Sequence, residues 1–538
     1  MNIRALSAAD LRAALVDGSE LAILDAREEG EFARAHLFWA VPCPLSVADL
    51  RAPSLLPRRG VRIVTIDGGG GEAERLARLL AGLGCTDVSV LAGGIAAWKA
   101  AGGELFSGVN VPSKAFGEWV EHHYGTQSID AAELQRKREE GAGMVVLDAR
   151  TFEEFQRMSI PGGISVPGGE LVYRIGDLAP DPETLVVVNC AGRTRSILGA
   201  ESLRQARIPN KVLALRNGTM GWELAGLTCA RGATGGYPAG TPASTAIARA
   251  RATRFAEEAG VRTIDHAELA ALSADPARSL YRLDVRSPAE YRAGHLPSSR
   301  SAPGGQLVQA TDGWVAVRGA RLVLIDDTGV RARMAGGWLA RMAPWEVLVL
   351  EDGPGDGLAG PLETGPEPRP AAPPVSLVNV SDLVSWRDLP GTMPDTVIID
   401  CAKSLDYRAG HIPGALWGLR GRLGALAPTL ASAERVVLTS PDGWLAAHAT
   451  AEAAALTQAP VHVLAGGTES WRQAGESLAA TPADPPDEAC IDVNLRPYDR
   501  ASGAEEAMRA YLSWEIGLAE QIGRESSVAF GVRGDARL

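Results

Sequence analysis

One sequence element occurs four times along the chain, and this repetition constrains the fold more than any other feature. In each copy a short apolar run ends in aspartate and is soon followed by an acidic residue next to an aromatic one. The four aspartates are Asp25, Asp148, Asp284 and Asp400. The copies are too long to be solenoid units, so each is expected to fold as a domain with its own core.

A second element closes three of the copies. Two turn residues precede a tryptophan that lies at nearly the same distance from the aspartate each time; these are Gly93-Gly94 with Trp98, Asn217-Gly218 with Trp222, and Gly466-Gly467 with Trp471. The third copy has Glu351-Asp352-Gly353 and no tryptophan there. We interpret the tryptophans as core residues, because large aromatic side chains at repeated positions dominate packing.

Within each copy, apolar runs alternate with helical patterns, as in residues 62–66, 72–83 and 88–91. This alternation predicts an α/β fold with a mostly parallel sheet flanked by helices. Thr151 with Glu154, and Ser287 with Glu290, have the spacing of capping boxes. They predict where the first helix begins in copies two and three.

The second copy carries the residues that indicate chemistry. An apolar run at 185–189 leads into Cys190 and then into the loop Ala191-Gly192-Arg193-Thr194-Arg195-Ser196, which opens a helix. A cysteine between a strand end and a helix N-terminus lies among backbone N–H groups, which lower the pKa of a thiol and favour the thiolate. The guanidinium groups of Arg193 and Arg195 suit oxyanions. We predict that Cys190 is a nucleophile with an anion site around it.

The other three copies lack a thiol at the corresponding position. Their strands run into Asp67, Asp326 and the segment Thr439-Ser440. A carboxylate at this place repels an anionic substrate. We predict that copies one, three and four are catalytically silent and that they serve as scaffold or as a partner surface.

The cysteine loop and the fourfold frame resemble the rhodanese (sulfurtransferase) family, whose active-site loop reads Cys-x-x-x-x-Arg. The resemblance covers about nine-tenths of the chain. It implies four tandem rhodanese-like α/β domains at residues 1–110, 111–235, 245–357 and 375–480, of which only the second is catalytic. Segments rich in proline and glycine separate them at 233–244 and 358–374, and a helical tail occupies 488–538, with its helix at 504–522.

The resemblance also implies a double displacement. The Cys190 thiolate takes the outer sulfur of thiosulfate, sulfite leaves, and the persulfide passes its sulfur to cyanide or a thiol acceptor. The N–H groups from Ala191 to Ser196 would face this sulfur, and Arg193 and Arg195 would hold the sulfonate. Arg174 is expected to add a third positive charge at the mouth of the site, with an ordinary surface arginine as the equal alternative. No metal or organic cofactor is implied.

Three alternatives stay open. Related phosphatases use His-Cys-x5-Arg, but Asn189 precedes Cys190 and Arg195 is only five positions on, which favours sulfur over phosphatase or arsenate reductase chemistry. A sulfur-relay or interaction scaffold, loaded by a protein partner, is favoured by the three silent domains, whereas the paired arginines favour a small anionic donor. Cys229 is a candidate second thiol, although an incidental buried cysteine is the favoured interpretation.

Composition limits the partners and the cellular compartment that we expect for this protein. The net charge is −12 and the pI is near 5.3, so nothing favours nucleic acid as a partner. No apolar stretch is long enough to span a bilayer, and the N-terminal residues lack a signal-peptide pattern. The six cysteines include no Cys-x-x-Cys pair. We expect a cytoplasmic enzyme without membrane contact, whose partners are thiosulfate, a thiol or cyanide acceptor and a sulfur-acceptor protein.

Overall fold

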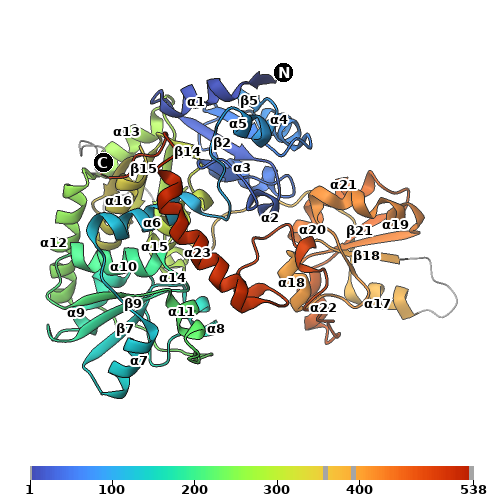
Figure 1. Cartoon of the computed structure of the whole chain (residues 1–538). Helices are drawn as coiled ribbons and strands as arrows, with labels where there is room; N and C mark the ends of the chain where they lie inside the picture. The colour runs from blue at the N-terminus through green and yellow to red at the C-terminus, as the bar shows by residue number, and fades with distance from the viewer. Residues whose placement is uncertain (1–2, 356–360, 389–395, 532–538) are drawn as a thin grey trace.

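A computed structural model describes residues 3–355, 361–388 and 396–531. It contains four α/β units, each built on a parallel sheet flanked by helices, as predicted (Figure 1). The predicted domain end at 357, the first residues of the linker 358–374 and the last residues of the tail lie outside the described residues.

The first unit has a sheet in the order β1-β5-β4-β2, with β3 beside β2. Its elements are β1 (Arg4–Leu6), α1 (Ala8–Val16), β2 (Leu21–Asp25), α2 (Glu29–Phe32), β3 (Ala40–Pro42), α3 (Ala48–Leu55), β4 (Arg62–Ile66), α4 (Glu72–Gly82), β5 (Asp87–Leu91) and α5 (Gly94–Ala100). A further strand, β14 (Val317–Arg318), comes from the third unit and pairs with β2 in the antiparallel direction. The sheet of the first unit therefore includes one short strand from the third unit, which the tandem arrangement did not predict.

The second unit has the parallel order β6-β10-β9-β7-β8, which puts the cysteine strand β9 at the centre. Its elements are α6 (Val111–Tyr124), β6 (Ser128–Ile129), α7 (Ala131–Glu139), β7 (Met144–Asp148), α8 (Phe152–Arg157), β8 (Ile164–Ser165), α9 (Leu171–Leu178), β9 (Leu185–Asn189), α10 (Thr194–Gln205), β10 (Val212–Leu215) and α11 (Gly218–Leu224).

The third and fourth units repeat this order, as β11-β16-β15-β12-β13 and β17-β21-β20-β18-β19. The third comprises α12 (Pro242–Glu258), β11 (Arg262–Ile264), α13 (His266–Ala274), β12 (Leu280–Asp284), α14 (Pro288–Ala293), β13 (Arg300–Ser301), α15 (Gly304–Gln309), the 3-10 turn Thr311–Gly313, β14, β15 (Arg321–Ile325), α16 (Val330–Met342) and β16 (Glu346–Leu350). The fourth comprises β17 (Leu377–Val378), α17 (Val380–Asp388), β18 (Thr396–Asp400), α18 (Ser404–Ala409), β19 (Leu416–Trp417), the 3-10 segment Arg420–Leu426, α19 (Ala427–Ser432), β20 (Arg435–Thr439), α20 (Trp444–His448), α21 (Thr450–Ala454), β21 (Val461–Leu464) and α22 (Gly467–Gln473).

The tail follows with 3-10 turns at Asp487–Ala489 and Pro497–Asp499 and then α23 (Ala504–Ile522), a helix with the predicted range. It runs back from the fourth unit and lies against α6 (Figure 1). The tail is therefore brought to the second unit, far from its place in the sequence.

Local sequence signals explain several of these elements. Both predicted capping boxes are confirmed: the Thr151 hydroxyl accepts a hydrogen bond from the Glu154 N–H at 3.3 Å, and Ser287 does the same with Glu290 at 3.2 Å. The three repeated tryptophans are buried and belong to the core, as predicted; they are Trp98, Trp222 and Trp471.

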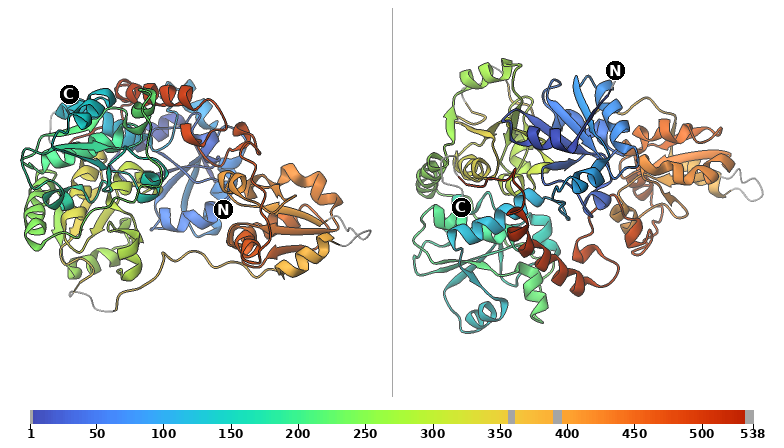
Figure 2. Two further views of the ribbon diagram at one scale, coloured as in Figure 1. Left: turned by 90° about the horizontal axis from the view of Figure 1, so that it is seen from below. Right: turned by 45° about the horizontal axis from the view of Figure 1, so that its top comes forward.

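The units differ in how they join. One continuous apolar cluster runs through the first three units and includes Leu518 of α23. The fourth unit has apolar clusters of its own and stands beside the first (Figure 2). Ion pairs join these two units, between Arg420 and Asp49 at 2.8 Å and between Arg422 and Glu31 at 2.7 Å. The first three units thus form one body with a common core.

Within residues 3–355, 361–388 and 396–531, no helix combines the length and the apolar character that crossing a membrane requires.

Candidate active site

Cys190 lies between the end of β9 and the start of α10, as the sequence predicts. Neighbouring side chains hold the strand end in place. The Asn189 side chain donates to Asp148 at 2.9 Å, and Asp148 also binds the Arg150 guanidinium at 2.7 Å. All three side chains are buried, so this polar cluster braces the sheet directly beneath the cysteine.

The start of α11 holds the cysteine from the other side. The backbone N–H groups of Thr219 and Met220 donate to the carbonyls of Cys190 and Ala191, at 2.9 and 3.0 Å. Gly218 has a φ of +55°, and a Cβ there would lie 2.2 Å from the Cys190 carbonyl oxygen. This close approach explains the turn residues in the second repeated element, because only glycine fits so near another backbone.

The Cys190 side chain is buried, with 2 % of its surface exposed. Burial raises the pKa of the thiol, while Arg195 and Ser196 lower it less and Glu515 raises it further. The expectation of a lowered pKa is therefore wrong for this closed arrangement, because desolvation of the thiolate outweighs the nearby positive charge.

Both loop arginines are neutralised by glutamates. The Arg193 guanidinium donates to Glu118 of α6 at 2.7 and 2.8 Å and also contacts Glu121. Arg195 forms a two-pronged ion pair with Glu154, at 2.7 and 2.8 Å. Although burial opposes the change, the charges of Arg195 and Arg150 lower the pKa of Glu154 to about 2.

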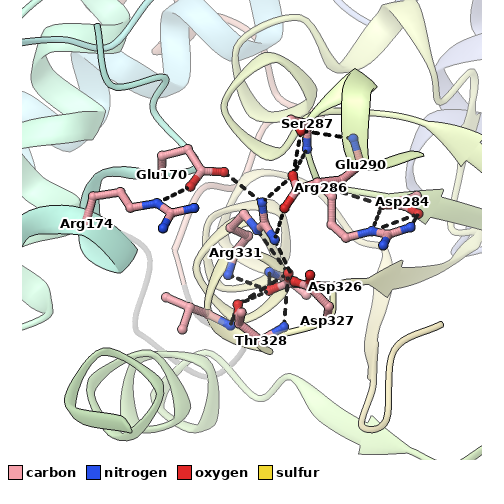
Figure 3. Close-up of polar contacts among 12 residues, drawn as sticks. Glu170, Arg174, Asp284, Arg286, Ser287, Glu290, Asp326, Asp327, Thr328 and Arg331 are labelled. Carbon is pink, nitrogen blue, oxygen red and sulfur yellow. Dashed lines mark hydrogen bonds and ion pairs between the residues drawn. The ribbon is translucent and has the colours of Figure 1, made fainter. Parts of the chain in front are cut away.

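Arg174 contacts residues at the start of its own helix, α9. It forms an ion pair with Glu170 at 2.9 Å and stacks on Tyr173, with its guanidinium carbon 3.8 Å from the ring centroid. Glu170 in turn binds Arg331 of the third unit at 2.8 Å (Figure 3). Arg174 is thus linked through Glu170 to the contact between the second and third units, and a third positive charge at the mouth stays a prediction.

The tail helix reaches the cysteine loop, a contact that the sequence did not predict. One oxygen of the Glu515 carboxylate accepts from the Thr194 hydroxyl at 2.5 Å and from the Thr194 N–H at 3.4 Å. A Cβ at Gly192 would lie 3.0 Å from the Tyr511 ring and 3.2 Å from the Glu515 carboxylate. The only sequence signal for this was the apolar pattern of α23, which indicates that the helix packs but not on what.

A cavity of about 840 Å³ opens beside the loop. Its walls come from several units and include Lys114, Glu154, Ala191, Arg195, Tyr511 and Trp514. Arg193 and Arg174 are not among its lining residues. Since small-molecule sites range from about 300 to 1,000 Å³, this cavity has room for a ligand larger than thiosulfate.

In each silent loop, a side-chain oxygen accepts hydrogen bonds from backbone N–H groups of the same loop. Each oxygen belongs to the residue in the place of Cys190: Asp67 accepts from Gly69 and Ala73 at 2.8 and 3.1 Å, Asp326 from Arg331 at 2.8 Å, and Ser440 from Ala446 at 3.2 Å. An anion that approaches these loops finds one or two of the N–H donors already satisfied, which supports the predicted silence of the three copies.

The third unit shows this most fully (Figure 3). Arg331 follows Asp326 by five positions, as Arg195 follows Cys190, and its side chain is 1 % exposed. It binds Asp326 at 3.0 Å and Glu290 at 2.8 Å, and Glu290 has the same capping-box position as Glu154. The third unit therefore has the same arrangement of loop arginine and capping-box glutamate as the second, with a carboxylate in place of the thiol.

The described residues contain no group of three or more His, Cys, Asp and Glu side chains that could hold a metal ion. Cys229 is buried, and burial raises its pKa to about 12. Neither Cys229 nor Cys190 is among the residues that line the cavity, which reaches the cysteine loop at Ala191 and Arg195.

The Rhodanese-like domain family matches residues 7–101, 130–225, 265–354 and 386–474, which together make up more than half of the chain. The chain belongs to the rhodanese-like family. A thiosulfate sulfurtransferase from Pseudomonas aeruginosa, known from its crystal structure, is 47% identical, covers 98% of this chain and 100% of its own, and superposes with a TM-score of 0.91. The superposition therefore spans all four rhodanese-like units of this chain.

Two further relatives match single units. The HTH-type transcriptional regulator Rv0324 from Mycobacterium tuberculosis is 36% identical over 111 residues, which are 20% of this chain; the chain spans about half, 47%, of that regulator's length. The Alr3790 protein from Anabaena sp. is 31% identical, with coverage of 20% of this chain and 85% of its own and a TM-score of 0.19.

Helices α6 and α23, which contact the cysteine loop, lie outside the four ranges matched by the rhodanese-like family.

Proposed function

We propose that this chain is a sulfurtransferase of the rhodanese class, which moves sulfane sulfur from thiosulfate to a thiol acceptor or cyanide through a persulfide on Cys190. One observation carries the proposal. Of the four residues that follow the equivalent central strands, Cys190 alone is a thiol, and the other three cap their own loops. The similarity to the Pseudomonas thiosulfate sulfurtransferase supports the same reaction class.

The reaction proceeds in two displacements. The Cys190 thiolate attacks the outer sulfur of thiosulfate, the S–S bond of thiosulfate breaks, and sulfite leaves with the bonding electron pair. The N–H groups of residues 191–196, apart from that of Thr194, which donates to Glu515, stabilise the negative charge on the resulting persulfide. An acceptor thiolate or cyanide then attacks the outer sulfur, and the electron pair of the broken S–S bond returns to Cys190 as thiolate.

The two arginines have different roles in this scheme. Arg195 lines the cavity and contacts the donor while Glu154 holds its orientation. Arg193 is buried with Glu118 and fixes the loop to α6, so it acts by positioning the loop and does not touch the donor. Cys190 is the catalytic residue.

A sulfur relay loaded by a protein partner is the second candidate. The three silent units favour it, since they offer surface without chemistry. The burial of Cys190 beneath α23 disfavours it, because a partner's cysteine could not reach a thiol that is 2 % exposed without displacing the tail. All six cysteines are free, which supports a reduced, cytoplasmic setting for either role.

The test is the release of sulfite from thiosulfate in the presence of cyanide. We expect activity in the native chain, no activity in Cys190→Ser, and native activity in the matched control Cys229→Ser. Mass spectrometry after thiosulfate alone should find one added sulfur on the peptide that contains Cys190. Activity that survives in Cys190→Ser and disappears in Cys229→Ser would refute the assignment, and inactivity of the native chain with thiosulfate would favour the relay.

A further inference from the structure

The positive charge that is available to an anionic donor does not come from the cysteine loop alone. Arg193 and Arg195 are each balanced by a glutamate, at 2.7 Å in both cases. Glu515 adds a further negative charge beside the loop. A dianion such as thiosulfate needs a cation with spare charge, because bringing it into a low-dielectric cavity without one is costly.

Lys114 of α6 is such a cation. Its side chain is nine-tenths buried, with 9% of the residue exposed, and it lines the same cavity as Ala191 and Arg195. Among the described residues no carboxylate oxygen lies within 4.0 Å of its Nζ. Its ammonium group has been moved out of bulk water without an ion-pair partner, an arrangement that destabilises the empty site and favours an arriving anion.

Two aromatic rings of the tail helix hold the ammonium group in place. The Lys114 Nζ is 5.0 Å from the ring centroid of Tyr511 and 4.6 Å from that of Trp514. Both rings also line the cavity. Cation–π contacts stabilise the charge without neutralising it, so the ammonium group remains able to bind an anion.

The charged neighbours leave Lys114 largely protonated at neutral pH. Burial lowers its pKa to about 8, while Glu515, Asp312 and, more weakly, Glu29 raise it, and Arg195 lowers it. These carboxylates act at longer range than an ion pair, and they offset part of the desolvation.

We propose that Lys114, held against the rings of Tyr511 and Trp514, binds the oxyanion end of the sulfur donor. This subsite rests on the proposed function, since it assigns the donor's position in the same reaction. It is assembled from α6 and from the tail helix α23, so the donor is recognised by segments that lie outside the four ranges matched by the rhodanese-like family. A small dianionic donor fits it, and an uncharged donor gains nothing from it.

The first experiment measures binding without turnover. Calorimetric titration of thiosulfate and sulfite into Cys190→Ser gives the reference affinity. Adding Lys114→Met to this variant should weaken both affinities about tenfold to a hundredfold, the loss typical of a charged hydrogen bond. Lys114→Arg keeps the charge and should retain most of the affinity. Lys99→Met, which removes an exposed lysine on α5, is the matched control and should change nothing.

The second experiment uses the otherwise native chain. Lys114→Met should raise KM for thiosulfate by a similar factor and leave KM for the acceptor thiol unchanged, and Lys114→Arg should largely restore the native value. Circular dichroism checks folding; if the methionine variant unfolds, Lys114→Gln replaces it with the same expected loss.

The outcomes separate the two proposals. Equal anion affinity with and without the Lys114 charge would overturn the subsite. Anion binding that depends on Lys114 in a chain that releases no sulfite would support the subsite and refute the proposed reaction. Equal loss of affinity in Lys99→Met would also overturn it, because the effect would then reflect overall charge.

Discussion

Removal of Arg193 should destabilise the cysteine loop far more than it weakens donor binding. Arg193→Met leaves Glu118 without its cation in a place where that carboxylate is fully buried, with 0% of its side chain exposed. Burial raises the pKa of Glu118 to about 7, so breaking this buried ion pair costs about 3–5 kcal/mol at a pH well above that value, where the carboxylate stays charged. Glu121, at 24%, keeps contact with water, so we expect the lower end of this range, about 3 kcal/mol.

Hydrogen exchange of the α10 amides is the appropriate assay, because a chain of four units need not unfold in one step. A loss of about 3 kcal/mol should speed exchange about a hundredfold where the amides exchange through a shared opening. The double variant Glu118→Gln with Arg193→Met removes the stranded charge and should recover most of the protection. Arg136→Met breaks an exposed pair with Glu140 and should change exchange by less than about tenfold.

Two results would refute this reasoning. Unchanged exchange in Arg193→Met would mean that the ion pair with Glu118 does not support the loop. A large rise in KM for thiosulfate without any change in exchange would return Arg193 to the substrate-binding role that the sequence predicts.

Three further predictions concern the surroundings of the site. Burial, opposed by a 2.5 Å hydrogen bond from Ser46, raises the pKa of Glu28 to about 7; the protonated form therefore stabilises the fold below about pH 4.5, and this stability is lost as the pH rises through 7. At pH 8.5, Glu28→Gln should thus melt at a higher temperature than the native chain, with a free energy of unfolding larger by at most about 3 kcal/mol. The difference in melting temperature should shrink toward pH 5, and a difference independent of pH would contradict this. Gly218→Ala should lower kcat at least tenfold while far-UV circular dichroism is retained, because its Cβ would meet the Cys190 carbonyl at 2.2 Å; native kcat would show that the loop adapts. Glu515→Gln removes a charge that raises the pKa of Cys190, so iodoacetamide should alkylate that thiol faster at pH 7, and a slower reaction would reverse the assigned sign.

Much of the fold could be predicted from short stretches of sequence. The capping box at Thr151 and Glu154 depends on residues three positions apart, and the apolar runs that became β7 and β9 depend on their own composition. The joining of the first and third units was not predictable in this way. It depends on β14, a strand of two residues that pairs with β2 from another unit, and so short a strand has no periodicity to read.

The candidate site likewise has a part that the local sequence predicts and a part that it does not. Cys190 and the loop after it were identifiable because a strand, a thiol and a helix start are contiguous, so their geometry follows from local backbone preferences. The charge state of the site could not be identified from the sequence, because each loop arginine pairs with a glutamate from another helix. Arg193 pairs with Glu118, and Arg195 pairs with Glu154. Long side chains choose partners in space, and the spacing of charges in the sequence carries little information about which ones they meet.

By itself the sequence determined the fourfold repeat, the parallel α/β architecture and the position of the single loop that carries a thiol, because these depend on contacts between residues close in the chain. Only the tertiary structure decided what surrounds Cys190. Thr194 and Glu515 are 321 positions apart and yet share a hydrogen bond of 2.5 Å, and Lys114 gains its aromatic neighbours from the same distant helix. Such contacts arise when the apolar face of α23 is buried on α6, a choice governed by the shape and burial of the whole surface.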